Sequence, residues 1–432
     1  MKKKKGIIRK LYLYMKSNPM ILLVLGIMFL SFFLRIYEIE SRSPFGWDQI
    51  DNAWKAKNII VNNEFPLLGM QAKGSSGIFI GPFYYYFVAI FYFITNLDPI
   101  ASGIIAGVSG LFSMIVLYLI VKKIFSTGIA VIALVLNGFT VSVIMFERVQ
   151  WPVNFIPIIG LLIFFSLYKI TTGKVKYILL LSLSFGIGLH IHFTVLFYPI
   201  IILLALPFFP RTKETLKYIL LGLVIVVPFI VPTVIAYINQ AQNISSAATY
   251  GQSYYHGFHL RRVMQLLNDG FIQFIPYFMY DWLKLLKLII LPVFIFIYLY
   301  KNISRNSIIF CYLLMLFFIV PWFVLSTYSG ELTDYYFAVN KFLALMVISY
   351  LIYRIYIIPN VLVKIIVVVL IIIHIAYNIN AFMISREGNS LSSKRATVLE
   401  KIERGEKIGF YEGVAESYLY FYYMRKKGEN VY

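Results

Sequence analysis

The stretch FGWDQIDNAW, residues 45–54, follows the first long hydrophobic run and places two carboxylates beside a membrane-spanning segment. Asp48 and Asp51 are three residues apart, so a helix would carry both on one face. Two interpretations are open. Asp48 could cap a surface helix while Asp51 stays solvated, or one of the two acids could act as a general base at the membrane surface.

The composition of the whole chain indicates an all-α, multi-pass membrane protein. Of its 432 residues, 60% are hydrophobic and 13% are charged, and the mean hydropathy is +0.80. Ordinary soluble domains carry about 25% charged residues. Many apolar runs are long enough to cross a bilayer. The single cysteine, Cys311, excludes an intrachain disulfide and a cysteine metal cluster.

The net charge of +20 could point to nucleic acid, but the basic residues concentrate in short loops between apolar runs. No nucleic-acid-binding module is visible, so we expect no nucleic-acid partner. The N-terminal sequence MKKKKGIIRK precedes an apolar run that lacks a small-residue cleavage site. We therefore expect an uncleaved first helix that starts in the cytoplasm.

The apolar runs predict eleven spans. They are placed at about 19–37, 101–121, 127–146, 152–168, 177–190, 193–209, 217–238, 282–300, 307–326, 336–353 and 362–382. Tyr84–Thr95 is too short to cross, and we expect it to lie at the interface within a first outer loop, residues 38–100. The predicted transmembrane domain is 1–384, and 385–432 forms a short extracytoplasmic segment.

This topology follows the positive-inside rule, because the loops it places in the cytoplasm are basic. They carry Lys122, Lys123, Lys169, Lys174, Lys176, Arg211, Lys213, Lys217, Lys301, Arg305, Arg354 and Lys364. Only His374 lies deep in a span, where we expect a packing residue, so the sequence argues against an ion or proton pathway. The other polar residues gather in the outer loops.

Cations and imidazoles at headgroup level suit a phosphate whose lipid chain stays in the bilayer. A nearby carboxylate suits removal of a proton from an attacking hydroxyl. The outer loops supply Glu147 and Arg148, His190 and His192, His256, His259, Arg261 and Arg262, Lys284 and Lys287, and Asp334, Tyr335, Tyr336 and Lys341. No phosphate-binding glycine loop of the Walker type is present. The simplest donor that fits these residues is a membrane lipid phosphate that carries the group to be transferred.

The order of these features resembles the GT-C superfamily of integral membrane glycosyltransferases. The closest resemblance is to the family-39-like branch, which includes protein O-mannosyltransferases and the lipid A aminoarabinose transferase. It covers roughly residues 20–350 and is strongest in FGWDQIDNAWKAKNIIVNNEFPLLG and GPFYYYFVAIFYF, with support from FERVQWP. It implies a GT-C bundle of about eleven transmembrane helices, with interfacial helices in the first outer loop.

The resemblance also implies roles for individual residues. The family's first-loop motif is usually Asp-Glu, and its aspartate is implicated in acceptor activation; here the pair is Asp48-Gln49. Because the second acid is missing, Asp51 is a candidate substitute, and we assign no metal ligands, although a divalent metal stays an open alternative. Basic residues of the second outer loop contact the donor phosphate in relatives, which points to Arg148. Asp334-Tyr335-Tyr336-Phe337 matches a later His-Tyr-Phe motif without its histidine.

The sequence thus predicts a plasma-membrane glycosyltransferase that moves a sugar from a polyprenyl-phosphate donor to an extracytoplasmic acceptor with inversion. Asp48 and Asp51 are the predicted catalytic residues. Arg148, His190, His192, Arg261 and Arg262 are the predicted phosphate ligands, and Trp47, Gln49, Tyr84, Tyr85, Glu147, His256, His259, Asp334, Tyr335, Tyr336 and Lys341 are the predicted substrate contacts. The alternatives are a non-catalytic polyprenyl-lipid flippase or binding protein, and a polymerase or ligase with a lipid-pyrophosphate donor. The sugar and the acceptor, whether glycan, lipid or protein, stay open.

Overall fold

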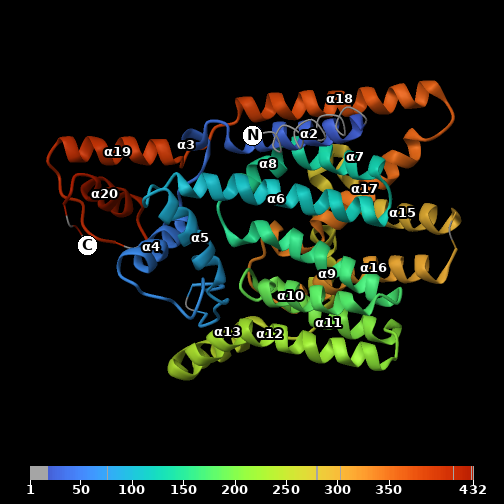
Figure 1. Cartoon of the computed structure of the whole chain (residues 1–432), viewed down its shortest axis with the longest axis horizontal. Coiled ribbons are helices and arrows are strands. Elements are labelled where there is room, and N and C mark those ends of the chain that lie inside the picture. The colour runs from blue at the N-terminus through green and yellow to red at the C-terminus, as the bar shows by residue number, and fades with distance from the viewer. Residues whose placement is uncertain are drawn as a thin grey trace, which may run out of the picture.

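The computed structural model describes residues 18–432 except 75, 279–280, 302, 412, 430 and 432. The described part is helical, and its β-pairing is limited to isolated bridges such as Gln71 with Phe79. The long apolar helices run roughly parallel along the horizontal axis of Figure 1. They are α2 (Pro19–Ile36), α6 (Ala101–Ile124), α9 (Ile156–Thr171), α12 (Lys213–Asn239), α15 (Lys287–Lys301), α16 (Arg305–Leu325), α17 (Lys341–Tyr356) and α18 (Val361–Ile384).

Shorter elements connect these helices. Helices α3 (Ile39–Arg42), α4 (Trp47–Val61) and α5 (Phe83–Ile94) follow α2, and α7 (Thr127–Phe139) and α8 (Val141–Arg148) follow α6. Next come η1 (Pro152–Phe155), η2 (Val175–Tyr177), α10 (Ile178–Gly188), η3 (Phe193–Leu196), α11 (Phe197–Ala205) and η4 (Leu206–Phe208). The remainder are α13 (Ala241–Tyr254), α14 (Leu260–Gly270), η5 (Ile272–Tyr277), η6 (Asp281–Leu286), η7 (Asp334–Asn340), α19 (Leu391–Glu403) and α20 (Ala415–Lys426).

The helices make this a multi-pass membrane protein, although the predicted number of spans is not confirmed. Within the described residues, eight helices are long and apolar enough to cross a bilayer, or nine if the bent pair α7–α8 is one span. The predicted spans 177–190 and 193–209 coincide with the shorter apolar helices Val175–Gly188 and Phe193–Phe208. Of the most apolar stretch of α9, 78% is buried, against 11% for α12, so α9 lies in the core and α12 faces lipid.

Helices α7 and α8 meet at a bend of 66°. Two side chains of α18 stabilise this bend. The Thr140 hydroxyl at the bend lies 3.0 Å from His374 Nε2, and the Val141 backbone amide donates to Asn378 Oδ1 over 2.9 Å. An amide freed by a helix break needs such a partner where water is excluded. His374, expected to be a packing residue, therefore holds two helices together.

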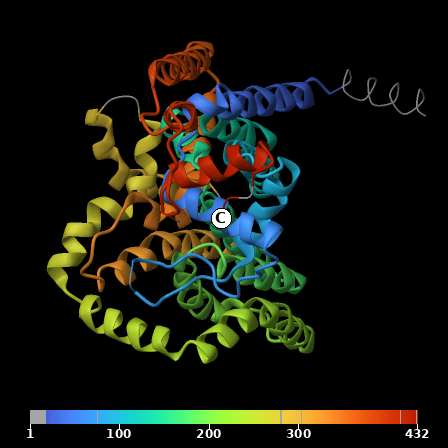
Figure 2. The same ribbon diagram turned by 90° about the vertical axis from the view of Figure 1, so that its left-hand side faces the viewer.

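The first outer loop and the C-terminal segment share one end of the bundle. In Figure 1, α3, α4, α5, α13, α19 and α20 lie at the left-hand end, whereas the loops that follow α6, α11 and α17 lie at the right-hand end. Figure 2 looks onto the left-hand end. The Tyr418 ring of α20 packs edge-on against Trp54 of α4, and Arg395 of α19 pairs with Asp98. The C-terminal segment is therefore packed onto the first loop.

Candidate active site

Helix α4 carries Asp48 and Asp51 into one cavity of ≈ 630 Å³. The acids lie on the face of α4 that also bears Trp47 and Lys55. The opposite wall comes from the segment 66–71 and from Ala236, Asn239 and Gln240 at the end of α12. The predicted placement of both acids on one helical face is thus what the structure shows.

The start of α4 is fixed by Gln49, which is buried. Its Oε1 accepts from the Gly46 backbone amide over 3.0 Å, and its Nε2 donates to the Gln150 carbonyl over 2.7 Å. The side chain of Gln150 in turn donates to the Tyr84 hydroxyl over 2.8 Å. Gln49 and Tyr84 therefore position α4 and α5 from outside the cavity, so we do not carry them forward as substrate contacts.

Burial raises the pKa of the Asp48 carboxyl, and the neighbouring charge of Asp51 raises it further. Asp51 differs, because its Oδ2 accepts a hydrogen bond of 2.6 Å from the Tyr85 hydroxyl. Burial raises the pKa of Tyr85, so this phenol keeps its proton and remains the donor. The two acids thus have unequal environments: one carboxyl binds a proton more readily, and the other is oriented by a tyrosine.

His190 is buried, and protein groups already occupy both of its ring nitrogens. Nδ1 accepts from the Phe83 backbone amide over 3.2 Å, and Nε2 lies 2.8 Å from the Phe229 carbonyl, to which it must donate. Burial lowers the pKa of this imidazole. His190 therefore clamps the start of α5 to α12 as a neutral ring, and the predicted contact with donor phosphate has no nitrogen left to form it.

The His190 clamp requires glycine at position 81. An alanine Cβ there would lie 2.0 Å from His190 Nδ1, whereas nothing lies within 4 Å of a Cβ added at Gly74. We expect Gly81→Ala to lower the free energy of unfolding by about 1–3 kcal/mol, as overpacking does in other cores. Thermal unfolding in detergent measures the effect, with Gly74→Ala as the matched control. Equal melting temperatures for the two variants would contradict the clamp.

His192 lies in an aromatic cluster rather than beside Asp48. Its ring centroid is 5.5 Å from those of both Tyr335 and Tyr336, and its Nδ1 accepts from the Thr194 backbone amide over 3.2 Å. Burial lowers its pKa to about 4, so it is neutral at physiological pH. Lys73 supplies a cation here, with its Nζ 5.8 Å from the centroid of the Tyr336 ring. Sequence reasoning missed Lys73 and Lys55, because isolated lysines in a loop and on a helix carry no pattern.

Arg148 and Glu147 lie among backbone and charged groups of α2. The Arg148 guanidinium donates to the carbonyls of Leu34, Arg35, Glu38 and Arg42 at 2.8–3.4 Å. Leu34 and Arg35 lie in the last turn of α2, and Arg42 ends α3, where carbonyls lack helical partners. Glu147 accepts from buried Arg35. The predictions that Arg148 binds phosphate and Glu147 binds substrate therefore lose their support, because both side chains are engaged within the protein.

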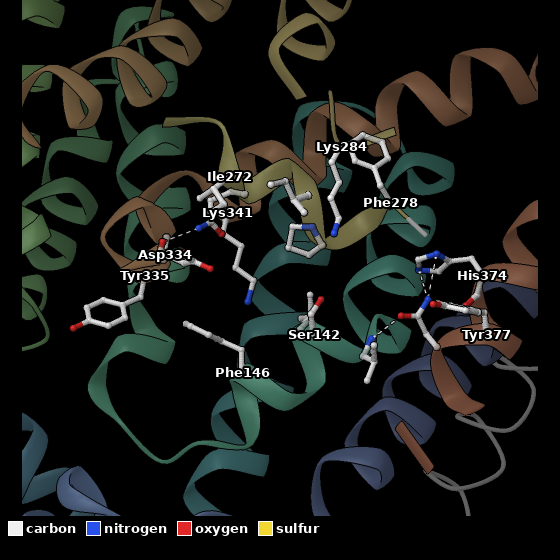
Figure 3. A pocket seen from close by; sticks show the side chains of 17 residues that line it. Ser142, Phe146, Ile272, Phe278, Lys284, Asp334, Tyr335, Lys341, His374 and Tyr377 are labelled. Carbon is white, nitrogen blue, oxygen red and sulfur yellow. Dashed lines mark hydrogen bonds between the residues drawn. The ribbon is translucent and has the colours of Figure 1, made fainter. Parts of the chain in front are cut away.

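The remaining predicted residues line two other cavities. His256, His259, Arg261 and Arg262 line one of ≈ 380 Å³, where Arg262 donates to the Gly330 carbonyl over 3.0 Å. Asp334, Tyr335 and Lys341 line one of ≈ 550 Å³ (Figure 3). Neither shares a lining residue with the Asp48 cavity. The fold thus separates cations that the sequence suggested would act together. Throughout the described ranges, no three His, Cys, Asp or Glu side chains are grouped to hold a metal ion.

An apolar cavity of ≈ 400 Å³ adjoins the acidic one. Its walls come from α12, through Phe229, Ile230, Thr233, Val234, Tyr237 and Ile238, and from the segment around His192 and Phe193. Phe79 lines both cavities. Its backbone amide donates to the Tyr237 hydroxyl over 2.9 Å, which fixes this dividing residue to α12.

Comparison with known proteins agrees with this architecture. Residues 80–235 match the family model described as dolichyl-phosphate-mannose-protein mannosyltransferase. ArnT from Cupriavidus metallidurans, in a crystal structure bound to undecaprenyl phosphate, superposes with a TM-score of 0.55 at 10% identity. That match covers 93% of this chain and 75% of the ArnT chain. A comparison with curated protein sequences gave no match.

The oligosaccharyltransferase of Archaeoglobus fulgidus has the same architecture. Its apo form superposes with a TM-score of 0.56 at 13% identity, covering 93% of this chain and 59% of that protein. A second structure of the enzyme, AglB with an inhibitory peptide and a dolichol-phosphate, gives a TM-score of 0.51 at 13% identity over 85% of this chain and 56% of AglB. The chain therefore has the GT-C fold of ArnT and AglB, and residues 80–235 are similar to the protein mannosyltransferase family.

Proposed function

We propose that this protein transfers a sugar from a polyprenyl-phosphate donor to a hydroxyl acceptor, with Asp48 as the general base. One observation carries the proposal. The cavity that contains Asp48 and Asp51 shares Phe79 with an apolar cavity along lipid-facing α12. A donor with a hydrocarbon chain, a phosphate and a sugar needs such a succession of apolar and polar environments.

The donor is expected to enter from the bilayer with its chain along α12 and its sugar beside α4. The phosphate then lies near Phe79, within reach of the cluster of Lys73, His192 and Tyr336. Lys73 is the cation of that cluster, and neutral His192 is able to donate from Nε2. The structures of ArnT with undecaprenyl phosphate and of AglB with a dolichol-phosphate support a lipid phosphate in this fold.

The chemical step is a single displacement. The acceptor O–H gives its proton to Asp48 while the oxygen attacks the anomeric carbon. The bond from that carbon to the phosphate oxygen breaks, and the polyprenyl phosphate leaves with the bonding electrons. A phosphate leaving group needs little protonation, so positive charge around it stabilises the transition state. Attack opposite to the leaving group inverts the anomeric configuration.

We infer that the reaction takes place outside the cytoplasm, at the plasma membrane. The Asp48 cavity lies at the end of the bundle that bears α4 and α5. The basic loops that follow α6, α11 and α17 lie at the other end, and the positive-inside rule assigns those loops to the cytoplasm.

The test is transfer by purified protein in vesicles, with polyprenyl-phosphate sugars that carry an isotopic label. The proposal predicts release of polyprenyl phosphate together with a labelled product of inverted anomeric configuration, as read by NMR. A flippase or binding protein would move or retain the lipid without cleaving it, and a ligase of the alternative type would require a pyrophosphate donor. Failure of every monophosphate donor alongside turnover of a pyrophosphate donor would overturn the proposal.

The pH dependence of transfer reports on Asp48. A general base must be ionised, so the rate is expected to fall as the pH drops through the raised pKa of Asp48, above the usual aspartate range of about 4. Replacing Asp51 by asparagine removes one cause of that raised pKa and should move the acidic limb to lower pH. The rate profile of Asp51→Asn against wild type measures this shift, with exposed Lys364→Gln as the control. If the acidic limb of the rate profile does not shift in Asp51→Asn, the charge of Asp51 does not influence the pKa of Asp48.

A further inference from the structure

A separate cavity of ≈ 550 Å³ holds two lysines that the proposed reaction does not use. Its walls come from α8, η5, η6, η7, α17 and α18. Figure 3 shows the side chains of Lys284, from η6, and Lys341, from α17, pointing into it. None of its lining residues lines the Asp48 cavity or the apolar cavity along α12.

Lys341 has an unusual environment for a charged residue. It is the first residue of α17, lies in the candidate span Asp334–Tyr356, and is 4% exposed. Its Nζ lies 4.3 Å from the centroid of the Phe146 ring, and among the described residues it forms no ion pair. The nearby carboxylate of Glu147 is paired with Arg35. An ammonium buried at membrane depth is costly unless an anion or hydrogen-bond acceptor reaches it.

Several polar side chains of the cavity have partners within the protein. Gln273 Nε2 donates to the Asp334 carbonyl over 3.0 Å, and His374 and Asn378 hold the bend at Thr140. Among the described lining residues, Asp334 supplies an acid, and Lys284 and Lys341 supply two cations. The cavity thus has room and positive charge for an anion, with amide and hydroxyl groups at its edge.

The remaining walls are apolar and reach the lipid-facing side of the bundle. Val141, Val143, Ile272, Ile275, Pro276 and Phe278 line the cavity. It extends to α18, of whose most apolar stretch only 17% is buried, and Tyr377 on that helix is 55% exposed. A ligand held here would therefore place its anion between the lysines and its hydrocarbon against α18.

We propose that this cavity binds the phosphate of a membrane lipid, with Lys284 and Lys341 as its ligands, at a site distinct from the donor site. The phosphate oxygens accept hydrogen bonds from both ammonium groups, and the lipid chain leaves past Tyr377 along α18. Basic pockets between transmembrane helices bind lipid headgroups by the same chemistry. Either a polyprenyl phosphate or an anionic phospholipid carries the required group.

A photo-crosslinking phenylalanine analogue at the position of Tyr377 tests the proposal in the full-length protein. The protein is placed in vesicles of phosphatidylcholine that contain either phosphatidylglycerol or a polyprenyl monophosphate. After irradiation, mass spectrometry identifies the lipid attached to the protein. We expect attachment of the anionic lipid, whether phosphatidylglycerol or the polyprenyl monophosphate, to fall about tenfold in Lys341→Met and in Lys284→Gln. Each substitution removes a charge-assisted hydrogen bond. Lys341→Arg should retain attachment, and Lys364→Gln at the far end of α18 is the matched control.

The mass of the adduct decides between the sources of the phosphate. Adducts of the polyprenyl lipid alone identify a second binding site for polyprenyl phosphate. Adducts of both lipids identify a site for anionic lipids in general. Adducts of phosphatidylcholine alone, or yields unchanged by both lysine substitutions, would overturn the proposal. The readout involves no sugar transfer, so its failure would leave the role of Asp48 untouched.

Discussion

Replacing Asp48 by asparagine is expected to lower the rate of sugar transfer by about 10²–10⁴-fold, the usual contribution of a positioned general base. Asparagine preserves the shape of the side chain in the cavity, but it cannot take the acceptor proton. Single-turnover transfer from a polyprenyl-phosphate sugar separates this chemical step from donor binding, which should change little.

The stability of the same variant provides the control. Because the pKa of Asp48 is raised in the folded protein, folding favours the protonated form, and the stability that this group contributes falls as the pH rises above its unfolded pKa. At neutral pH, Asp48→Asn should therefore unfold at the same temperature as wild type or a higher one. Near-normal turnover would remove Asp48 from the mechanism, and loss of the folded state would contradict the environment described for this carboxyl.

Removing Glu147 is expected to have the largest effect on folding. Its carboxylate accepts from Arg35, whose side chain is fully buried between α2, α6 and α8 and also donates to the carbonyls of Ser31 and Asn137. We expect Glu147→Leu to cost about 3–5 kcal/mol, since it leaves a buried guanidinium without its counter-charge. Reversible unfolding in detergent mixtures measures the change in free energy.

The double variant distinguishes a buried ion pair from simple packing. Replacing Arg35 by methionine and Glu147 by leucine removes both charges together, and such replacements of buried pairs are often neutral or stabilising. Most of the stability lost in Glu147→Leu should therefore return. A double variant less stable than the single one would show that Arg35 acts through its other hydrogen bonds.

The architecture and the shared helical face of the two candidate catalytic acids could be predicted because they depend on local signals. Hydrophobic runs determine the spans, and the spacing of Asp48 and Asp51 determines that both lie on one face of α4. The predicted spans at 177–190 and 193–209 are not confirmed as crossings, because helices α10 and α11 are shorter than a bilayer crossing requires. The motif FGWDQIDNAW also identified the acids of the cavity, through its resemblance to the GT-C superfamily.

The cationic part of the site could not be predicted, because each side chain depends on partners far away in the sequence. Arg148 contacts carbonyls more than 100 positions earlier, and His190 contacts α12, so neither side chain is left for phosphate. Lys73 lies near Tyr336 only because the first loop folds over η7. Charge of one sign in several loops therefore predicts that this end of the protein binds anions, but it does not predict which cation contacts the anion.

The most direct test is a cryo-EM structure of the Asp48→Asn variant with an intact polyprenyl-phosphate sugar. We predict the hydrocarbon chain along α12, the phosphate near Phe79 and Lys73, and the anomeric carbon of the sugar in the cavity beside residue 48. A sugar bound away from α4, for example with its phosphate between Lys284 and Lys341, would contradict the account.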